Sequence, residues 1–513
     1  MVLLMMTCAA MVTFAAEPAL ADQQVYKDQG FSYTLEGTPA VANLTAYCYG
    51  GSTGPLVVPA TLGGYPVAHM GDNAFKDQYG ITNVTLPDSL ITIGNQAFYD
   101  STITSINIPR NVTSIGINVF TKCPRLVSIN VDPANQHFAD SSGVLYNKGL
   151  TTIILCPEGW SGPFVMPSTV VTLTNLAFWD CQLLTSVTFS NGVTSIGDDM
   201  FQDCSGLLSV SFGSGLRSIG NQSFISCTGL TTISFPASLQ SIGASAFNGC
   251  WGLNTISFPA SLQSIGRSAF GGCSGVASIT IPDGVTEIDA SAFSSCLSLQ
   301  SVHLGKALAS FDPSAFNFCS ALTSISVDPA NQHFADSSGV LCDKGLTTII
   351  IYPLAKSGPF VMPSTVVTLY GSVFSNCAQL TSISISNGVT SIGDNMFMGC
   401  SGLRSVSFGT GLKAIGNQSF LSCGGLTTIS LPNGLLSIGH SAFNNCWGLT
   451  GITLPDSLTY LDTSVFSGCT ALQSVHIGNG LSYIGDGSFS DCTALTSISV
   501  SYTHLTLPTN REV

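Results

Sequence analysis

Apolar positions recur along the chain with a spacing of about 23 residues. A phenylalanine marks each unit, and twelve of the fifteen steps between successive phenylalanines are 23 residues, while one is 22 and two are 58. The marker residues are Phe75, Phe98, Phe120, Phe178, Phe201, Phe224, Phe247, Phe270, Phe293, Phe316, Phe374, Phe397, Phe420, Phe443, Phe466 and Phe489. Such a short unit has too little apolar surface to fold alone, so neighbours must stack. The spacing therefore predicts a repeat solenoid of about sixteen coils.

The pattern inside one unit predicts the parts of a coil. In the unit 230–250, Ile233 and Phe235 alternate with Ser234, which is typical of a strand with one buried face. A proline and small residues then end the strand, and the Ala-Phe pair before the cysteine begins a short helical or 3₁₀ turn. We expect a parallel β-sheet on the concave face of the solenoid and these turns on the other side.

A longer period overlies the short one. The segment 131–145 recurs at 327–341, an offset of 196 residues, and the two 58-residue steps each contain 35 extra residues. Around Asn147–Gly149 and Asp343–Gly345, two alternating apolar segments flank a short polar turn, which predicts a β-hairpin. The array therefore has a 196-residue internal duplication and two enlarged coils, near 132–166 and 328–362.

Cysteine follows most of the marker phenylalanines by three residues, so fourteen of the eighteen cysteines share one register. Neighbours in this column would lie about 5 Å apart, within reach of a disulfide. Equivalent side chains point in parallel into one layer, however, where cysteine packs as a small hydrophobe. We favour free, packed thiols, with a disulfide ladder as the alternative. The predicted structural core comprises Phe201, Phe224, Phe247, Phe270, Phe293, Phe397, Phe420, Phe443, Cys204, Cys227, Cys250 and Cys273.

The repeat frame L-x-x-I-x-[LIF]-P-x-x-[LV]-x-x-I-G-x-x-A-F-x-x-C, present over residues 64–500, resembles the BspA-like leucine-rich repeats, a bacterial surface-antigen family. The resemblance implies enlarged coils and a role in adhesion or host-matrix binding. Residues 22–79 look like the divergent N-terminal capping coils that shield the first core layer. The regular leucine-rich repeat array then covers residues 80–500.

Both ends depart from the repeat. Residues 2–16 are apolar and are followed by Ala-Leu-Ala at 19–21, which predicts a secretory signal peptide over 1–21; the alternative is a buried N-terminal strand. Residues 501–513 abandon the frame and resemble a translated sequencing adapter, so we expect the natural C-terminus to be missing. The expected location is extracellular or at the cell surface, with membrane or wall attachment only through that missing part.

Composition narrows the function. Only 8% of residues are charged and the net charge is −14, so no basic stripe exists for binding nucleic acid. The mean hydropathy is +0.40, yet no apolar run of about 18 residues follows the first segment. Neither H-E-x-x-H nor G-x-x-x-x-G-K-[ST] occurs, and paired zinc knuckles are absent. We predict no enzyme, no metal site and no small-molecule cofactor.

A surface remains as the candidate for function. The outward strand position is serine or threonine in most units and histidine at His303 and His476, which predicts a nearly uncharged, hydroxyl-lined face. This face either binds polar partners or only keeps the sheet soluble with small residues that suit a strand. In the enlarged coils, His137, Trp160 and His333 are further candidate ligand contacts. Phe138 and Phe334 are either anchors or the local core of each hairpin.

We expect an exported binding or adhesion protein that presents this surface to an extracellular protein or glycan of a host or neighbouring cell. Each coil would add a weak contact along an extended surface. The alternative is a passive spacer or coat that carries a missing C-terminal module. Ice binding is disfavoured because serine outnumbers threonine in the outward columns.

Overall fold

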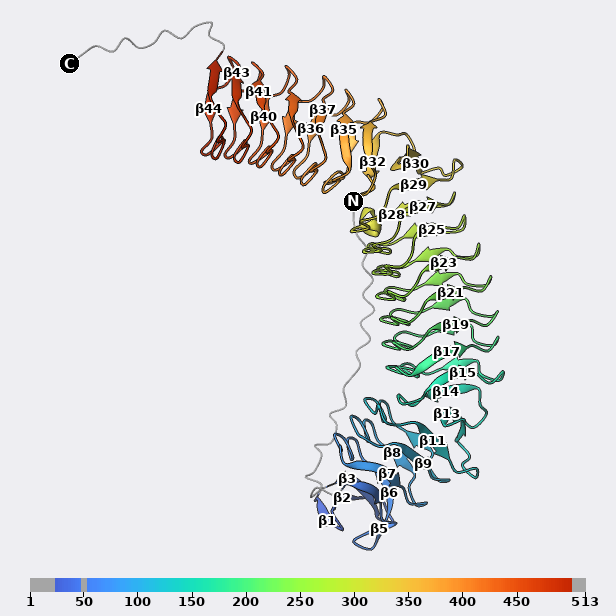
Figure 1. Cartoon of the computed structure of the whole chain (residues 1–513). Coiled ribbons are helices and arrows are strands. Elements are labelled where there is room, and N and C mark those ends of the chain that lie inside the picture. Colours follow the sequence, from blue (N-terminus) through green and yellow to red (C-terminus); the bar gives the residue numbers. More distant parts are fainter. Residues whose placement is uncertain (1–23, 48–52, 501–513) are drawn as a thin grey trace, which may run out of the picture. The chain divides into compact units, whose positions relative to one another are not determined.

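The computed structural model describes residues 24–47 and 53–500, which form a β-solenoid of about 20 coils with almost no helix (Figure 1). The predicted repeat solenoid with parallel sheets is confirmed. The structure has more coils than the sixteen that the marker phenylalanines predicted, because the opening coils and the enlarged coils add layers that contain no marker phenylalanine. The chain divides into two compact units, Met1–Trp160 and Ser161–Val513. The predicted signal peptide and the segment 501–513 lie outside the described residues.

The first unit opens with an antiparallel meander that passes into parallel coils. Its strands β1, β2 and β3 pair antiparallel, and β3 then pairs parallel to β6. The strands of this sheet are β1 (Tyr26–Asp28), β2 (Phe31–Glu36), β3 (Val41–Tyr47), β5 (Thr61–Leu62), β6 (Tyr65–Met70), β8 (Thr92–Ile93) and β10 (Ser114–Ile115). A parallel sheet runs through the same coils with β4 (Gly54–Val57), β7 (Ile81–Thr85), β9 (Ser105–Ile108) and β11 (Ser128–Val131).

In the second unit, each ordinary coil contributes one longer strand and one two-residue strand, and each kind forms a row of several short parallel sheets. The long strands are β15 (Gly162–Val165), β17 (Leu184–Thr188), β19 (Ser209–Ser211), β21 (Thr232–Ser234), β23 (Thr255–Ser257), β25 (Ser278–Thr280), β27 (Ser301–Leu304), β29 (Ser324–Val327), β33 (Gly358–Val361), β35 (Leu380–Ser384), β37 (Ser405–Ser407), β39 (Thr428–Ser430), β41 (Gly451–Leu454), β43 (Ser474–Ile477) and β45 (Ser497–Val500).

The short strands are β16 (Thr172–Leu173), β18 (Ser195–Ile196), β20 (Ser218–Ile219), β22 (Ser241–Ile242), β24 (Ser264–Ile265), β26 (Glu287–Ile288), β28 (Ser310–Phe311), β34 (Thr368–Leu369), β36 (Ser391–Ile392), β38 (Ala414–Ile415), β40 (Ser437–Ile438), β42 (Tyr460–Leu461) and β44 (Tyr483–Ile484). Where successive strands of either set pair, they pair in parallel with equivalent residues opposite each other, as Ile219 is with Ile242. The inward side chain of one coil therefore packs on its counterpart in the next.

Each enlarged coil carries the predicted hairpin and one strand more. The hairpin strands pair antiparallel, and the strand before them pairs antiparallel with the first of the two. These strands are β12 (Phe138–Ser141), β13 (Val144–Asn147) and β14 (Thr152–Leu155), and their duplicates are β30 (Phe334–Ser337), β31 (Val340–Asp343) and β32 (Thr348–Ile351). The Asn147 amide oxygen accepts hydrogen bonds from the Thr151 and Thr152 N–H groups at 2.8 and 3.0 Å, which fixes the tip.

The segment of each coil that contains the marker phenylalanine differs from the predicted short helical or 3₁₀ turn. Among the described residues, one 3₁₀ helix, η1 (Pro313–Phe316), is present, and the other Ala-Phe segments are turns. Their N–H groups bond to the next coil: Phe224 N–H donates to Ala246 O and Ser226 N–H to Asn248 O, both at 2.8 Å. Bonds between coils use the donors that bonds within a helix would need. We call this face the turn side.

On the turn side, most coils have a non-glycine residue with an unfavourable positive φ, and a glycine at that position should stabilise the fold. The residue two positions after the marker phenylalanine has a positive φ, 59° at Ser226, whereas the equivalent Gly249 and Gly272 have 73°. We expect Ser226→Gly to stabilise its coil by about 0.5–1 kcal/mol, because a non-glycine residue pays for the left-handed region. Urea unfolding measures the change. Ser234→Gly, in strand β21, is the matched control and should destabilise by a similar amount; equal effects at both sites would contradict the assignment.

Within each block of ordinary coils, the core contains a stack of phenylalanine rings. Phe247 lies 5.1 Å from Phe224 and 5.2 Å from Phe270, centroid to centroid, with the rings within 3° and 7° of parallel. The twelve residues assigned to the core from the sequence all have 0% exposure. Each coil is therefore held mainly by its two neighbours.

Candidate ligand-binding surface

The outward positions of the long strands form columns of hydroxyl groups. In β19, Ser209 and Ser211 are exposed on either side of the buried Val210. Ser211 pairs with Thr188 before it and Ser234 after it. We call these outward serine and threonine residues of the second unit the hydroxyl face. They offer donors and acceptors without charge, which suits neutral polar ligands.

The two candidate histidines of this face occupy equivalent places. His303 pairs between Thr280 and Ser326, and its Nδ1 lies 3.0 Å from the Ser326 hydroxyl oxygen. His476 pairs between Thr453 and Ser499, with its Nδ1 2.9 Å from the Ser499 hydroxyl oxygen. Each ring is thus oriented by the next coil while it stays partly exposed.

The enlarged coils present a second pair of histidines on a fixed turn. His137 and His333 are exposed. The fully buried Asn135 donates from its amide to Pro109 O and Val112 O at 2.8 and 2.9 Å. Its amide oxygen accepts from the N–H groups of His137 and Phe138, both at 2.8 Å.

The duplicate turn has the same geometry. Asn331, also fully buried, donates to Gly305 O and Leu308 O at 3.0 Å, and accepts from His333 and Phe334 N–H at 2.8 Å. All four hydrogen-bonding positions of each amide are used. The two histidines therefore extend from rigid turns and are not on free loops.

The aromatic candidates of the enlarged coils are less exposed than the sequence indicated. Trp160 is half-buried. Phe138 packs against the core of the first unit, and the Phe334 ring lies 6.1 Å from that of Phe311. Phe138 and Phe334 therefore serve the local packing of their coils, which was the alternative for these two residues.

Two tryptophans that the sequence analysis did not single out are strongly exposed. Trp251 and Trp447, a duplicated pair, each follow a column cysteine and are 63% and 53% exposed. A Cβ added at Gly424 would lie 2.5 Å from the Trp447 ring, so that ring covers the backbone of the preceding coil. The available signal was tryptophan at a position where most other units have serine or threonine.

The cysteine column has a structural role. No disulfide joins the cysteines within residues 24–47 and 53–500, and Cys8 and Cys48 lie outside these residues. The Cys250 thiol donates to Phe224 O, in the preceding coil, at 3.2 Å, and this contact recurs along the column. Burial raises the pKa of Cys250 to about 12. A neutral, buried thiol is a poor nucleophile and a poor metal ligand.

No group of three or more His, Cys, Asp or Glu side chains within residues 24–47 and 53–500 is placed to hold a metal ion. Over the same residues, no helix has the length and apolar character to cross a membrane. What the described chain offers is an extended surface.

Comparison with known sequences decides the family. The sequence model described as "BspA type Leucine rich repeat region (6 copies)" matches residues 65–158, 163–273, 240–357, 352–473 and 413–510. The chain belongs to the BspA-type leucine-rich repeat family. No match was found among curated proteins.

Solved structures include other leucine-rich repeat proteins. A leucine-rich repeat protein from Bacteroides ovatus is 25% identical, with a TM-score of 0.57, over 71% of this chain and 92% of its own. A leucine rich cell surface protein from Faecalibacterium prausnitzii is 23% identical, over 94% and 96% of the chains, with a TM-score of 0.29. The pneumococcal vaccine antigen PcpA is 18% identical, over 89% and 87%, with a TM-score of 0.36. Of these three TM-scores, the first exceeds 0.5, and it supports the leucine-rich repeat fold.

Proposed function

We propose that this BspA-type protein is an exported binding protein that acts at the cell surface or after secretion and contacts an extracellular protein or glycan of a host or neighbouring cell. The observation that carries the proposal is the pair of exposed histidines, His137 and His333, each held on a rigid turn by a buried asparagine. Rigid polar groups that stand out from a uniform surface suit specific contacts, because little entropy is lost when they bind.

The descriptions of related structures and the hydroxyl face support the same proposal. Relatives in structure are described as a cell surface protein and as a vaccine antigen. The hydroxyl face adds many uncharged polar groups in register, so that weak contacts can accumulate along the coils. A surface of this kind needs no catalytic group, and we propose that the protein is not an enzyme.

The experiment compares binding to extracellular-matrix proteins and to a glycan array. We expect His137→Ala/His333→Ala to weaken binding roughly tenfold, since anchors of an interface commonly contribute more than 1 kcal/mol each. His440→Ala is the matched control, because His440 is an exposed histidine of an ordinary coil. It should leave binding unchanged.

The alternative function is a passive spacer that holds another module away from the cell. A variant that lacks both hairpins, and still folds by circular dichroism, distinguishes the two. Loss of binding supports the enlarged coils as the contact region. Full retention would assign the contacts to the hydroxyl face, and no binding by the unaltered protein would favour the spacer.

A further inference from the structure

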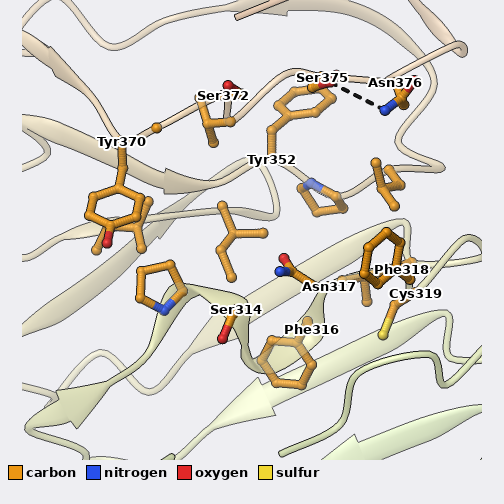
Figure 2. Close-up of a pocket in the computed structure, with 18 of the residues that line it drawn as sticks. Ser314, Phe316, Asn317, Phe318, Cys319, Tyr352, Tyr370, Ser372, Ser375 and Asn376 are labelled. Carbon is orange, nitrogen blue, oxygen red and sulfur yellow. Dashed lines mark hydrogen bonds between the residues drawn. The ribbon is translucent and has the colours of Figure 1, made fainter. Parts of the chain in front are cut away.

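The second unit has a pocket where its turn side lacks one layer. In ordinary coils the turn segments bond directly: Phe293 N–H donates to Ala315 O at 2.9 Å and Ser295 N–H to Asn317 O at 2.8 Å. After residue 319, the enlarged coil adds strands but no Ala-Phe turn segment. A pocket of about 670 Å³ lies here, lined from 312–322, 350–354 and 370–376 (Figure 2). Its volume is in the range of ligand sites.

The lining is aromatic and almost without charge. Phe316 and Phe318 come from one side, and Tyr352 and Tyr370 from the other (Figure 2). Asp312 is the only charged residue of the lining, and its carboxylate already accepts from the Ser314 N–H at 2.8 Å. The pocket therefore suits a neutral ligand with an aromatic or large aliphatic group.

Phe318 combines two features that are unfavourable in a folded chain, an exposed aromatic side chain and a left-handed backbone conformation. Its side chain is 71% exposed and its φ is 62°. A bulky residue in the left-handed region is a strong outlier, and equivalent coils use Ser295 or Gly272 there. Neither packing nor backbone geometry explains a phenylalanine at the mouth of this pocket, and such outliers often mark functional sites.

Comparison of the two copies of the internal duplication shows which pocket residues are specific to the second copy. Residues 357–369 are identical to 161–173, yet the neighbouring lining positions differ. Phe318 and Leu354 correspond to Lys122 and Glu158 in the first copy. There the buried Glu158 carboxylate accepts from the Lys122 N–H at 2.6 Å. Leu354 cannot do so, and the Phe318 N–H makes no hydrogen bond within the described chain.

The opposite wall offers acceptors. In the other coils, the carbonyls one and three residues before the marker phenylalanine accept from the preceding turn segment, as Ala246 O and Ala244 O do. The equivalents before Phe374 are the carbonyls of Val373 and Gly371, which line the pocket and accept no backbone hydrogen bond from the described residues. A donor on one wall thus faces acceptors on the other.

We propose that this pocket binds a short, extended, neutral segment of a partner protein that carries an aromatic or large aliphatic side chain and replaces the missing turn segment. An extended peptide presents N–H and C=O groups on both edges, so it can accept from Phe318 N–H and donate to the carbonyls of Gly371 and Val373. Its side chain packs among the aromatic residues. Neither His137 nor His333 lines this pocket.

The probes are fluorescein-labelled pentapeptide mixtures, acetylated and amidated, with phenylalanine, leucine, alanine or aspartate fixed at the centre. Fluorescence anisotropy gives the apparent Kd with the full chain. We expect the phenylalanine mixture to bind at least tenfold more tightly than the aspartate mixture. A backbone N-methylated phenylalanine mixture should lose at least tenfold in affinity, because it cannot donate to the carbonyl wall.

Variants that copy the first repeat block test the site. Phe318→Lys/Leu354→Glu should close the donor as Glu158 does and weaken binding at least tenfold. Phe318→Ser, the residue type that other coils have there, is a milder second variant and should weaken binding in the same direction. Leu436→Glu is the matched control, because Leu436 is 52% exposed in an ordinary coil, and it should bind like the unaltered protein. Circular dichroism and the thermal midpoint verify folding.

Several outcomes would overturn the inference. No binding of any mixture, or equal binding by Phe318→Lys/Leu354→Glu, would remove the pocket as a peptide site. Binding that survives N-methylation would reduce it to a site for small aromatic molecules. A dimer in sedimentation velocity that the same variant dissociates would make a second copy the occupant. His137→Ala/His333→Ala should leave peptide binding intact, so failure here is separable from failure of the proposed function.

Discussion

The protein is expected to unfold at alkaline pH, well before an ordinary β-protein of its size. Burial raises the pKa of Cys250 and of Cys400 to about 12 in the fold, whereas a thiol of the unfolded chain titrates near about 8.5. The stabilisation is fully present below that lower value and is lost as the pH rises toward 12. Each such thiol costs about 1.4 kcal/mol per pH unit, or about 2 kcal/mol at pH 10.

Burial also raises the pKa of eight further thiols of the column, which are Cys123, Cys227, Cys273, Cys296, Cys377, Cys423, Cys446 and Cys492. The loss summed over these ten thiols exceeds the roughly 5–15 kcal/mol that usually stabilises a domain. Urea midpoints from circular dichroism at pH 7, 8, 9 and 10 should fall progressively. Cys250→Ser is the matched control, since a hydroxyl can still donate to Phe224 O but does not titrate in this range. Hydrogen exchange of its coil should depend less on pH. A midpoint that stays constant to pH 10 would contradict the prediction.

Phe247→Ala should cost roughly 3–5 kcal/mol, as other truncations of buried aromatic residues do. The ring is fully buried and stacked on both sides, at 5.1 and 5.2 Å from its neighbours. Because each coil contacts only its neighbours, the damage should remain local. Hydrogen exchange should accelerate in the coils of Phe224, Phe247 and Phe270 and little elsewhere.

The matched control is Phe318→Ala, which removes the same atoms from a ring that is 71% exposed. It should change stability by less than about 0.5 kcal/mol, as exposed substitutions usually do. Exchange that rises evenly over all coils, or equal costs at the two positions, would show that the stack is not the main support of each coil.

The coil could be predicted from sequence because each of its parts is repeated many times. Ile233 and Ser234 alternate as their equivalents do in other units, so a strand with one buried face follows from local pattern alone. The turn side was predicted less well. Its conformation depends on hydrogen bonds to the next coil, such as Phe224 N–H to Ala246 O, and a pattern within one unit carries no information about them.

The candidate site divides in the same way. The histidines were found because they interrupt a column of hydroxyl residues, and the structure places His303 and His476 at the expected outward positions. The exposure of Trp251 and the burial of Trp160 depend on how neighbouring coils cover each ring, so residue type alone did not distinguish them. The pocket arises from the absence of a turn segment, which a search for residues that are present does not detect.

The repeated contact between coils also bears on how such a gene can change. Each ordinary coil offers its successor the same ring, thiol and backbone groups that it receives from its predecessor, as Phe224, Phe247 and Phe270 illustrate. Unequal recombination that adds or removes whole units therefore leaves every junction chemically the same. The length of the array is free to vary between relatives, whereas a unit inserted after residue 319 would fill the one layer that the second block leaves open.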